Sequence, residues 1–320
     1  MTPIYRRVVM KQKAWAPEQA PSQKGKIAVV TGTGGLGYET ALVLAQKGAE
    51  VILAGRNPDK GNESVSKIKA LHPGALIRFE ALDLASLKSV ADFSVRLSRQ
   101  ASRLDLLVNN AGVMTPPKRK TTTDGFELQF GTNYLGHFSL TAHLLPLLKA
   151  AQGARVVNVC SLAHRGGKIR FNDLQWEQGY RPFAAYGQSK LANLMFSLEL
   201  QRRSDANNWK ITSIGSHPGF ALTELIPNGP GAKGLSSLFV RYLMQWWASQ
   251  SPADGALPSL FAAMAVDAQP GGYYGPDTWL YELKGPVGPA KIMPQALDQG
   301  VAKKLWEVSE KLTNTHWPKN

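Results

Sequence analysis

Cysteine is nearly absent from the sequence, because Cys160 is the only one among 320 residues. A disulfide framework within the chain is therefore excluded, and no Cys/His cluster has the spacing of zinc ligands, so we predict no metal site. Disulfides are typical of small secreted domains, and a chain without them fits a reducing compartment. We therefore expect a cytoplasmic protein.

Long apolar runs are also missing. The first 26 residues are basic and lack the apolar stretch of a signal peptide. The longest stretch without charge, residues 128–148, is interrupted by several polar side chains and by Pro146, so we predict no transmembrane segment. We interpret residues 1–24 as a basic N-terminal extension and residues 25–320 as one domain, which is an ordinary size for an α/β fold.

Acidic residues are few, with 23 Asp and Glu against 37 Lys and Arg, which gives a formal net charge of +14. Such a charge could attract nucleic acid or an anionic membrane. No basic cluster is interleaved with aromatic residues in a base-stacking pattern, so we expect no nucleic-acid partner. We interpret the charge as a solvated basic surface that favours a phosphorylated cofactor, and contact with a membrane surface stays open.

Short runs rich in Val, Ile and Leu alternate with segments of helical periodicity from Lys26 onward. The strand candidates are 27–31, 51–54, 76–80, 104–109, 154–160 and 211–216, and the helix candidates are 38–47, 58–70, 86–99, 126–148 and 184–202. This alternation predicts a parallel sheet covered by helices on both faces. The predicted fold class is α/β, a Rossmann-type doubly wound parallel sheet with three αβα layers in a single domain.

A glycine-rich loop, TGTGGLG at residues 31–37, follows the first strand and precedes a helix-forming segment. Gly32, Gly35 and Gly37 lack Cβ atoms, so the backbone there can turn tightly and approach a pyrophosphate closely. The N-terminus of the helix would then face the phosphate charge. A plain glycine turn is the alternative, and we favour a dinucleotide site because motifs further along the chain agree with it.

The second strand ends in the sequence AGRN, which bears on the choice of dinucleotide. Gly55 stands where a carboxylate would bind the ribose 2′-hydroxyl of NAD, and Arg56 follows directly. A guanidinium can bind a 2′-phosphate with two parallel hydrogen bonds, so we predict that NADP(H) is preferred over NAD(H), with Thr33 assisting. The alternative for Arg56 is an exposed helix-capping role. Asp83, just after the third strand, either accepts a hydrogen bond from the adenine amino group or caps the next helix.

Tyr186 and Lys190 form a YxxxK pattern that places them one turn apart on a shared face of a predicted helix. A cation about 5 Å from a phenolate, at an effective dielectric near 20, is worth about 3 kcal/mol and would lower a phenol pKa near 10 by roughly two. Tyr186 would then be a general acid for a carbonyl or a general base for an alcohol near neutral pH. The alternative is a Tyr/Lys pair on a solvated helix face.

Ser161 follows the predicted strand 154–160, at the carboxyl edge of the sheet. Its hydroxyl is placed either to hydrogen-bond a substrate oxygen and stabilise its developing charge or to cap a turn. Ser161 lacks the GxSxG pattern of a hydrolase nucleophile, and we expect the nearby His164 to shape the loop. Alternation along the strand points Cys160 away from Ser161, so we expect a packed, unreactive thiol. Asn133 lies inside the predicted helix 126–148, an expensive place for an amide unless it is hydrogen-bonded.

Together, in this order and spacing, the motifs resemble the short-chain dehydrogenase/reductase superfamily, especially its branch of retinol dehydrogenases and the WW-domain-containing oxidoreductase. The resemblance covers residues 26–219 and is carried by the glycine loop, NNAG at 109–112, TNYLGH around Asn133, NVCSLAH around Ser161, YGQSK at 186–190 and HPG at 217–219. The sequence departs from the family in one place, because TGTGGLG is one residue shorter than the usual TGxxxGxG.

The resemblance implies a catalytic set of Asn133, Ser161, Tyr186 and Lys190, in which Asn133 helps to hold a water that joins the lysine to solvent. It also implies that Asn109 and Asn110 tie the fourth strand to its neighbours. Cofactor contacts are implied for Gly32, Thr33, Gly35, Leu36, Gly37, Arg56, Asp83, Leu84, Asn110, Ala111, Gly112, Tyr186, Lys190, Pro218, Gly219 and Thr223.

The segment 235–248, LSSLFVRYLMQWWA, is apolar on nearly every face and needs to be covered by protein, substrate or a membrane surface. We expect a substrate lid at about 220–250 over an apolar pocket, which favours a hydrophobic small-molecule substrate such as a retinoid, steroid, terpenoid or long-chain aldehyde. An oligomer contact would use the same residues, and the family resemblance implies a homo-oligomer.

The predicted function is the NADP(H)-dependent interconversion of a hydrophobic aldehyde or ketone and its alcohol by hydride transfer. One alternative is a reductase of carbon–carbon double bonds, as in the similar protochlorophyllide reductases. The other is a non-catalytic nucleotide-binding scaffold, which the shortened glycine loop would favour.

Overall fold

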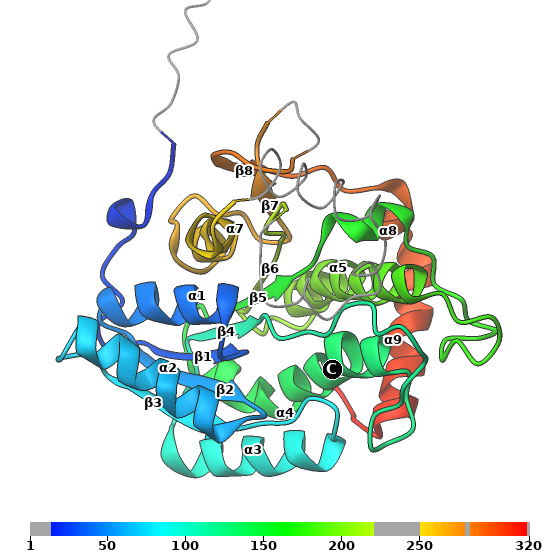
Figure 1. Ribbon diagram of the computed structural model, residues 1–320, viewed down its shortest axis with the longest axis horizontal. Coiled ribbons are helices and arrows are strands. Elements are labelled where there is room, and N and C mark those ends of the chain that lie inside the picture. Colours follow the sequence, from blue (N-terminus) through cyan, green and yellow to red (C-terminus); the bar gives the residue numbers. More distant parts are fainter. Residues whose placement is uncertain (1–13, 221–249, 279–281, 319–320) are drawn as a thin grey trace, which may run out of the picture.

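The computed structural model describes residues 14–220, 250–278 and 282–318 (Figure 1). Within them, eight strands form one sheet in the order β3-β2-β1-β4-β5-β6-β7-β8. The neighbours from β3 to β7 pair in parallel, and only β8 runs antiparallel to β7. The predicted doubly wound Rossmann-type sheet is confirmed.

Each strand of the predicted βα units is found close to its expected position. The strands are β1 (Ile27–Thr31), β2 (Glu50–Gly55), β3 (Ile77–Ala81), β4 (Leu106–Asn109), β5 (Arg155–Val159), β6 (Thr212–Ser216), β7 (Tyr273–Pro276) and β8 (Val287–Pro289). The helices are α1 (Gly35–Gln46), α2 (Pro58–Leu71), α3 (Leu87–Gln100), α4 (Gly136–Ala150), α5 (Pro182–Ala206), α7 (Pro252–Met264), α8 (Pro294–Leu297) and α9 (Gln299–Thr313). Three short elements complete the description: the 3₁₀-helices η1 (Pro17–Gln19) and η3 (Leu162–Gly166), and the π-helical turn η2 (Phe130–Leu135).

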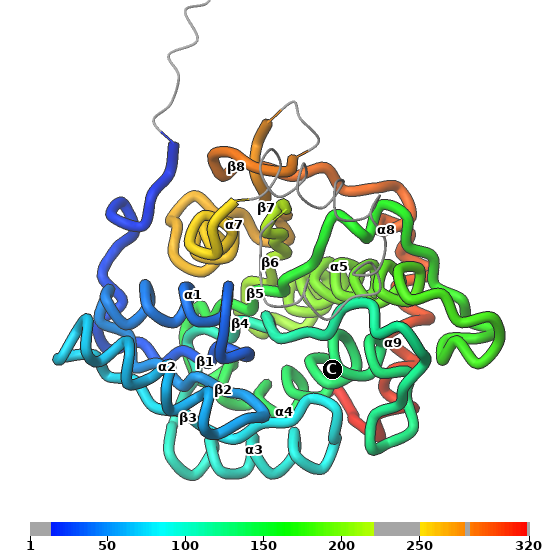
Figure 2. Tube along the Cα trace, viewed as in Figure 1, coloured from blue at the N-terminus to red at the C-terminus, as the bar shows by residue number. Residues whose placement is uncertain are grey.

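The core lies on both faces of the sheet, because consecutive strand residues point to opposite sides. In β1, Val29 belongs to the hydrophobic cluster shared with α3, α4, α5 and α9, whereas Ala28 and Val30 belong to the cluster shared with α1, α2 and α7. Figure 2 shows this arrangement, with α1 and α7 on one side of the sheet and α3 and α4 on the other. The molecule therefore has three αβα layers.

The amino-terminal part of the described chain packs onto this domain. Gln23 is fully buried, and its N–H donates to the carbonyl of Lys47 at 2.8 Å, while the ring of Trp15 meets the edge of Phe261 in α7 at 5.4 Å between centroids. Residues 14–24, which the sequence analysis assigned to the basic extension, are thus part of the folded unit. No helix among the described residues is long and apolar enough to cross a membrane.

The strand order places a site at one edge of the sheet. The chain runs from β1 outward to β3 and then returns to β4 on the other side of β1, so the connections at the carboxyl ends of β1 and β4 diverge. Ligands of doubly wound sheets bind in the crevice that this reversal leaves. The loops that carry the predicted motifs all start at this edge.

Candidate active site

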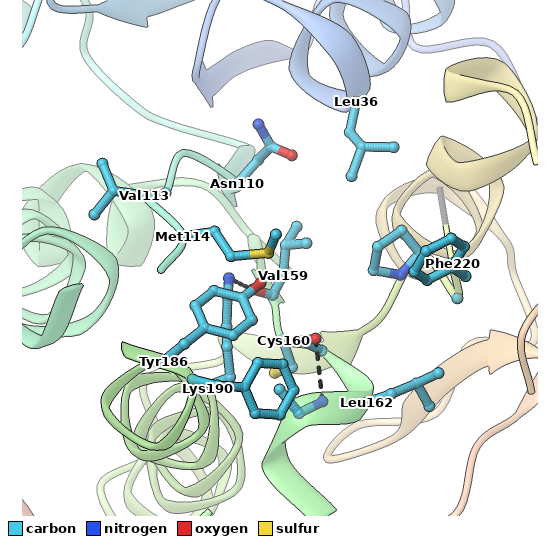
Figure 3. Close-up of a pocket in the computed structure, with 16 residues that line it drawn as sticks. Leu36, Asn110, Val113, Met114, Val159, Cys160, Leu162, Tyr186, Lys190 and Phe220 are labelled. Carbon is cyan, nitrogen blue, oxygen red and sulfur yellow. Dashed lines mark hydrogen bonds between the residues drawn. The ribbon is translucent and has the colours of Figure 1, made fainter. Parts of the chain in front are cut away.

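A pocket opens at the carboxyl ends of β1, β4, β5 and β6, between these strands and the start of α5 (Figure 3). Its described lining includes eight residues predicted from the sequence, namely Leu36, Asn110, Gly112, Ser161, Tyr186, Lys190, Pro218 and Gly219. These eight predicted residues are therefore brought together, although they come from segments far apart along the chain.

Tyr186 and Lys190 reach the pocket from the first turns of α5, as the YxxxK spacing predicts (Figure 3). Both side chains are almost fully buried, with exposed fractions of 8% and 4%. The ammonium nitrogen of Lys190 lies 5.8 Å from the centroid of the Tyr186 ring and donates a hydrogen bond to the carbonyl oxygen of Val159 at 2.9 Å. The alternative of a solvated Tyr/Lys pair is therefore wrong.

The acidities of these two groups differ from the expectation. Burial raises the pKa of Tyr186 to about 12, although its hydrogen bond with Ser161 acts in the opposite direction. Burial also lowers the pKa of Lys190 to about 8. The expected fall in the phenol pKa is wrong for the protein by itself, because removal from water disfavours the charged form of each group. At neutral pH the site holds a protonated phenol beside an ammonium group.

Ser161 begins the 3₁₀-turn η3 directly after β5 and serves as its N-cap. Its hydroxyl oxygen accepts a hydrogen bond from the N–H of Ala163 at 3.2 Å, and the residue lines the pocket beside Tyr186. The turn-capping interpretation of Ser161 is thus confirmed, and the substrate-oxygen role stays a prediction. Its neighbour Cys160 is 1% exposed, and burial raises the pKa of the thiol to about 12, as expected for a packed, unreactive cysteine.

Asn133 lies behind the pocket in the π-helical turn η2, and its amide is fully used. The oxygen accepts from the N–H of Val113 at 2.7 Å, and the nitrogen donates to the Val113 carbonyl and to the Ser189 hydroxyl, both at 3.0 Å. Ser189 in turn donates to the carbonyl of Tyr186 at 2.8 Å. Asn133 therefore joins the loop after β4 to the helix that carries Tyr186, which explains an amide at this buried position.

Two buried residues that the sequence analysis missed extend this network. The ring of His137 lies 2.9 Å from the carbonyl oxygen of Asn133 through Nδ1 and 2.9 Å from the hydroxyl of Thr31 through Nε2. The Thr31 hydroxyl accepts from the N–H groups of Asn110 and Ala111, each at 2.9 Å. Burial lowers the pKa of His137 to about 4, so the ring is neutral. The sequence signal was present, since both residues lie inside quoted motifs.

The two asparagines of the NNAG motif tie β4 to its neighbours, as predicted. Asn109 donates to the side chains of Asn158 in β5 at 2.9 Å and Thr141 in α4 at 3.1 Å. Asn110 donates through its side chain to the carbonyl of Thr31 at 2.7 Å. These bonds keep the ends of β1, β4 and β5 level, which fixes the floor of the pocket.

The glycine loop packs so closely that a side chain is excluded at two of its positions. A Cβ on Gly37 would overlap the carbonyl of Gly32, and one on Gly32 would lie 2.8 Å from the Asn110 amide, so only glycine permits this close packing. Gly34 is the N-cap of α1 and offers no side-chain acceptor to the first N–H groups of the helix. Helix α1 begins at Gly35, three residues earlier than predicted. The residues present thus fit a pyrophosphate at the helix N-terminus.

The predicted residues for the adenosine half lie beside this loop. A Cβ on Gly55 would lie 2.6 Å from the Thr33 methyl group, so Thr33 fills the space that a longer side chain at position 55 would need. Arg56 is exposed at the end of β2. Asp83 accepts from the N–H of Ala85 at 3.0 Å and thereby closes a turn, whereas Ser86 is the N-cap of α3. The helix-capping alternative for Asp83 is wrong, and Leu84 after it is buried.

The HPG motif completes the described pocket. Pro218 and Gly219 line it, and Gly219 has a φ of 65°, in the left-handed region that favours glycine. Thr223 and the helix predicted at 235–248, with most of the expected lid, lie outside the described residues. The described lining also includes the apolar residues Val113, Met114, Val159, Leu162, Ala163, Phe183 and Phe220.

The arrangement suits proton transfer to an oxygen atom held in an apolar pocket. Ser161 and Tyr186 both line the pocket, so a substrate oxygen held near the two hydroxyls could accept two hydrogen bonds. The Tyr186 phenol, protonated at neutral pH because its pKa is raised, could donate a proton to such an oxygen. The nearby Lys190 ammonium would stabilise the phenolate that this transfer leaves.

Comparison with protein families agrees with this geometry. Residues 26–229 match the model of the short chain dehydrogenase family. Retinol dehydrogenase 12 of Mus musculus is 40% identical over 296 residues, which cover 92% of this chain and 88% of the relative. Polyprenol dehydrogenase of Mus musculus is 40% identical over 303 residues, which cover 93% of this chain and 86% of the relative.

Solved structures of other proteins also superpose on this chain. A protein of Mycobacterium paratuberculosis without a described function superposes with a TM-score of 0.78 at 36% identity, covering 96% of this chain and 100% of that one. RhlG of Pseudomonas aeruginosa, solved as an NADP active-site complex, superposes with a TM-score of 0.62 at 26% identity, covering 79% and 94%. Together with the pocket, these matches identify the chain as a member of the short-chain dehydrogenase family of oxidoreductases, in a branch similar to the retinol dehydrogenases.

Proposed function

We propose that this protein is an NADP(H)-dependent oxidoreductase that interconverts a hydrophobic aldehyde or ketone and its alcohol, with Tyr186 as the proton donor and acceptor. The observation that carries the proposal is the position of Tyr186, which lines the pocket together with Ser161 and Lys190, opposite an apolar wall. When bound, the nicotinamide supplies or takes up the hydride. The residues of this chain hold the carbonyl oxygen and move its proton.

The preference for NADP(H) rests on the end of β2. Position 55 has no carboxylate to bind a ribose 2′-hydroxyl, and the space there is taken by the Thr33 methyl group. Arg56 is exposed beside it and can pair with a 2′-phosphate. The NADP complex of RhlG from Pseudomonas aeruginosa supports the same choice.

The substrate class follows from the lining of the pocket. Part of the lining carries no charge, namely Met114, Leu162, Phe183 and Phe220. Moving an apolar substrate from water into this pocket therefore costs less free energy than moving a polar one. The names of the relatives point the same way, since retinol and polyprenol are long apolar alcohols. We therefore propose a retinoid, a terpenoid or a long-chain aldehyde in preference to a small polar carbonyl.

The first experiment is a fluorescence titration of the purified protein with NADPH and NADH, followed by an absorbance assay of NADPH consumption with all-trans-retinal and decanal. We expect NADPH to bind more tightly than NADH and at least one aldehyde to be reduced. Arg56→Asp should weaken NADPH binding and spare NADH binding. If neither nucleotide binds, the proposal fails.

The mechanism is tested by Tyr186→Phe, which removes only the proton donor. Turnover should be abolished while NADPH affinity changes little. Tyr274→Phe is the matched control, because the Tyr274 hydroxyl bonds the N–H of Gln269 outside the pocket, and it should retain activity. An unchanged rate in Tyr186→Phe would overturn the assignment. Products of the active enzyme separate the two reductase types, since an allylic alcohol indicates carbonyl reduction and a saturated aldehyde indicates double-bond reduction.

A further inference from the structure

A buried polar cluster behind the pocket is not explained by the proton transfer. It lies at the carboxyl ends of β5, β6 and β7 and consists of His164, Arg165, His217, Tyr273 and Glu282. His217 is the first residue of the HPG motif, and the family pattern assigns it no separate role. Glu282 belongs to none of the motifs found in the sequence.

Glu282 is the centre of this cluster because its carboxylate meets three donors. One oxygen accepts from Arg165 at 2.6 Å and lies 3.2 Å from Nε2 of His217, and the other accepts from the backbone N–H of Lys291 at 3.0 Å. Burial alone would raise the pKa of Glu282, but the bond from His217 and the other donors hold this pKa below its usual value. The carboxylate is therefore ionised at neutral pH, with its acceptor positions filled.

The contact with His217 fixes the HPG turn. Nδ1 of His217 accepts from the N–H of Gly219 at 3.1 Å, so the neutral ring carries its proton on Nε2, the atom that faces Glu282. A Cβ on Gly275 would overlap the His217 ring, which leaves the ring little room to move. The orientation of Pro218 and Gly219, which line the pocket, therefore depends on the ring that Glu282 holds.

The contact of Glu282 with Arg165 holds the η3 turn on the other side of the pocket. Arg165 lies in η3, the turn that Ser161 begins, and the preceding His164 is held by Nδ1, which lies 2.7 Å from the carbonyl oxygen of Ser161. The residue after Glu282 also touches the pocket, because the carbonyl of Leu283 accepts from the N–H of Phe220 at 2.8 Å. One short segment of the chain thus holds both turns that flank the pocket.

We propose that Glu282 is a positioning residue, which sets the distance between the Ser161 turn and the HPG turn through Arg165 and His217. It touches neither the phenol nor the other pocket-lining groups, and it acts through the two side chains that it binds. This inference rests on the proposed function, since one turn carries the proposed substrate-oxygen contact of Ser161 and the other carries the proposed cofactor contacts of Pro218 and Gly219. Displacing reacting groups by about 1 Å costs roughly a hundredfold in rate, so a modest shift of either turn is measurable.

The test is Glu282→Gln, which keeps the size of the side chain but removes its charge. A role in stability alone would lower the fraction of folded enzyme, and this leaves the KM for decanal and the Kd for NADPH unchanged. A positioning role raises both constants and lowers kcat. We expect kcat/KM to fall by roughly ten- to a hundredfold.

Glu80→Gln is a matched control, because Glu80 is also a partly buried carboxylate that meets two arginines, Arg78 and Arg96, but it lies on β3 far from the pocket. Its kcat, KM and Kd should equal those of the unchanged protein. If Glu282→Gln fails to fold, Arg165→Gln tests the same link while the 3.2 Å contact between Glu282 and Nε2 of His217 remains. Where both variants fold, their effects on kcat/KM should be less than multiplicative in the double variant, since they break one shared contact.

The outcomes separate this inference from the function on which it rests. If the unchanged protein binds NADPH and reduces an aldehyde, but the Glu282 and Arg165 variants keep its KM and Kd, the positioning role is refuted and the proposed function stands. If the unchanged protein binds no nucleotide, the proposed function is refuted first. A rise in KM and Kd in the Glu282 variant, absent in the Glu80 control, supports the role.

Discussion

Replacing Gly112 by alanine adds one methyl group beside two functional side chains, those of Asn133 and Lys190. A Cβ at this position would lie 3.1 Å from the Asn133 amide oxygen and 3.8 Å from the Lys190 ammonium nitrogen. The backbone of Gly112 is outside the left-handed region, so alanine can adopt its conformation. The effect of the change therefore comes from the added volume alone.

The amide of Asn133 cannot move away without breaking bonds, because it is bonded to both the N–H and the carbonyl of Val113. Overpacking of this kind costs about 1 to 3 kcal/mol. Part of the strain should shift Asn133 and Lys190, and through them the proton-transfer geometry. We expect the kcat for decanal reduction to fall by roughly ten- to a hundredfold, because small misplacements have effects of that size.

Thermal unfolding and steady-state kinetics with NADPH and decanal measure the two effects separately. The unfolding temperature should fall by only a few degrees, as about 1 to 3 kcal/mol implies for a domain of this size. Gly74→Ala is the matched control, since nothing lies within 4 Å of a Cβ there and its backbone is also outside the left-handed region. If Gly112→Ala retains the kcat of this control, the packing argument is refuted.

Three further outcomes follow from the structure. Because burial lowers the pKa of Lys190 to about 8, its ammonium group loses a proton above that pH, and kcat/KM for NADPH should fall with an apparent pKa near 8; a flat profile to pH 10 would contradict this. A Cβ on Gly61 would overlap the Phe79 ring, so Gly61→Ala should lower stability by about 1 to 3 kcal/mol in a urea titration and spare kcat. Burial raises the pKa of Cys160 to about 12, so mass spectrometry should find it unmodified by iodoacetamide at pH 8 until urea unfolds the protein; rapid modification of the folded protein would refute this.

The sheet from β1 to β6 could be predicted because each strand is a short run of β-branched and aliphatic residues followed by a helical period. The two strands β7 and β8 could not, since YYGP and VGP contain glycine and proline and gain their strand character only by pairing with a neighbour. The observed helix boundaries differ from the predicted ones where tertiary packing determines them. Helix α1 begins inside the glycine loop, because the close contact between Gly37 and Gly32 is a property of the folded turn.

The residues of the site also divide into those that local sequence patterns predict and those that they do not. Tyr186, Lys190 and Ser161 were found because local spacing carries their chemistry. Glu282 was not, because its partner Arg165 is 117 residues away in the sequence and no local pattern joins them. A residue that holds two turns distant in the sequence is surrounded by no local sequence motif that would reveal its role.

The acidity of Tyr186 shows why burial has to be weighed against charge. An ammonium group about 5 Å away would by itself be worth about 3 kcal/mol and would lower the phenol pKa by roughly two. In the structure the phenol is 8% exposed, and its pKa is raised to about 12 with burial as the largest cause. This pKa is the net result of all the surroundings, so burial outweighs the nearby ammonium and the phenol is protonated at neutral pH. A protonated phenol suits the proton-donor role in carbonyl reduction that we propose for Tyr186.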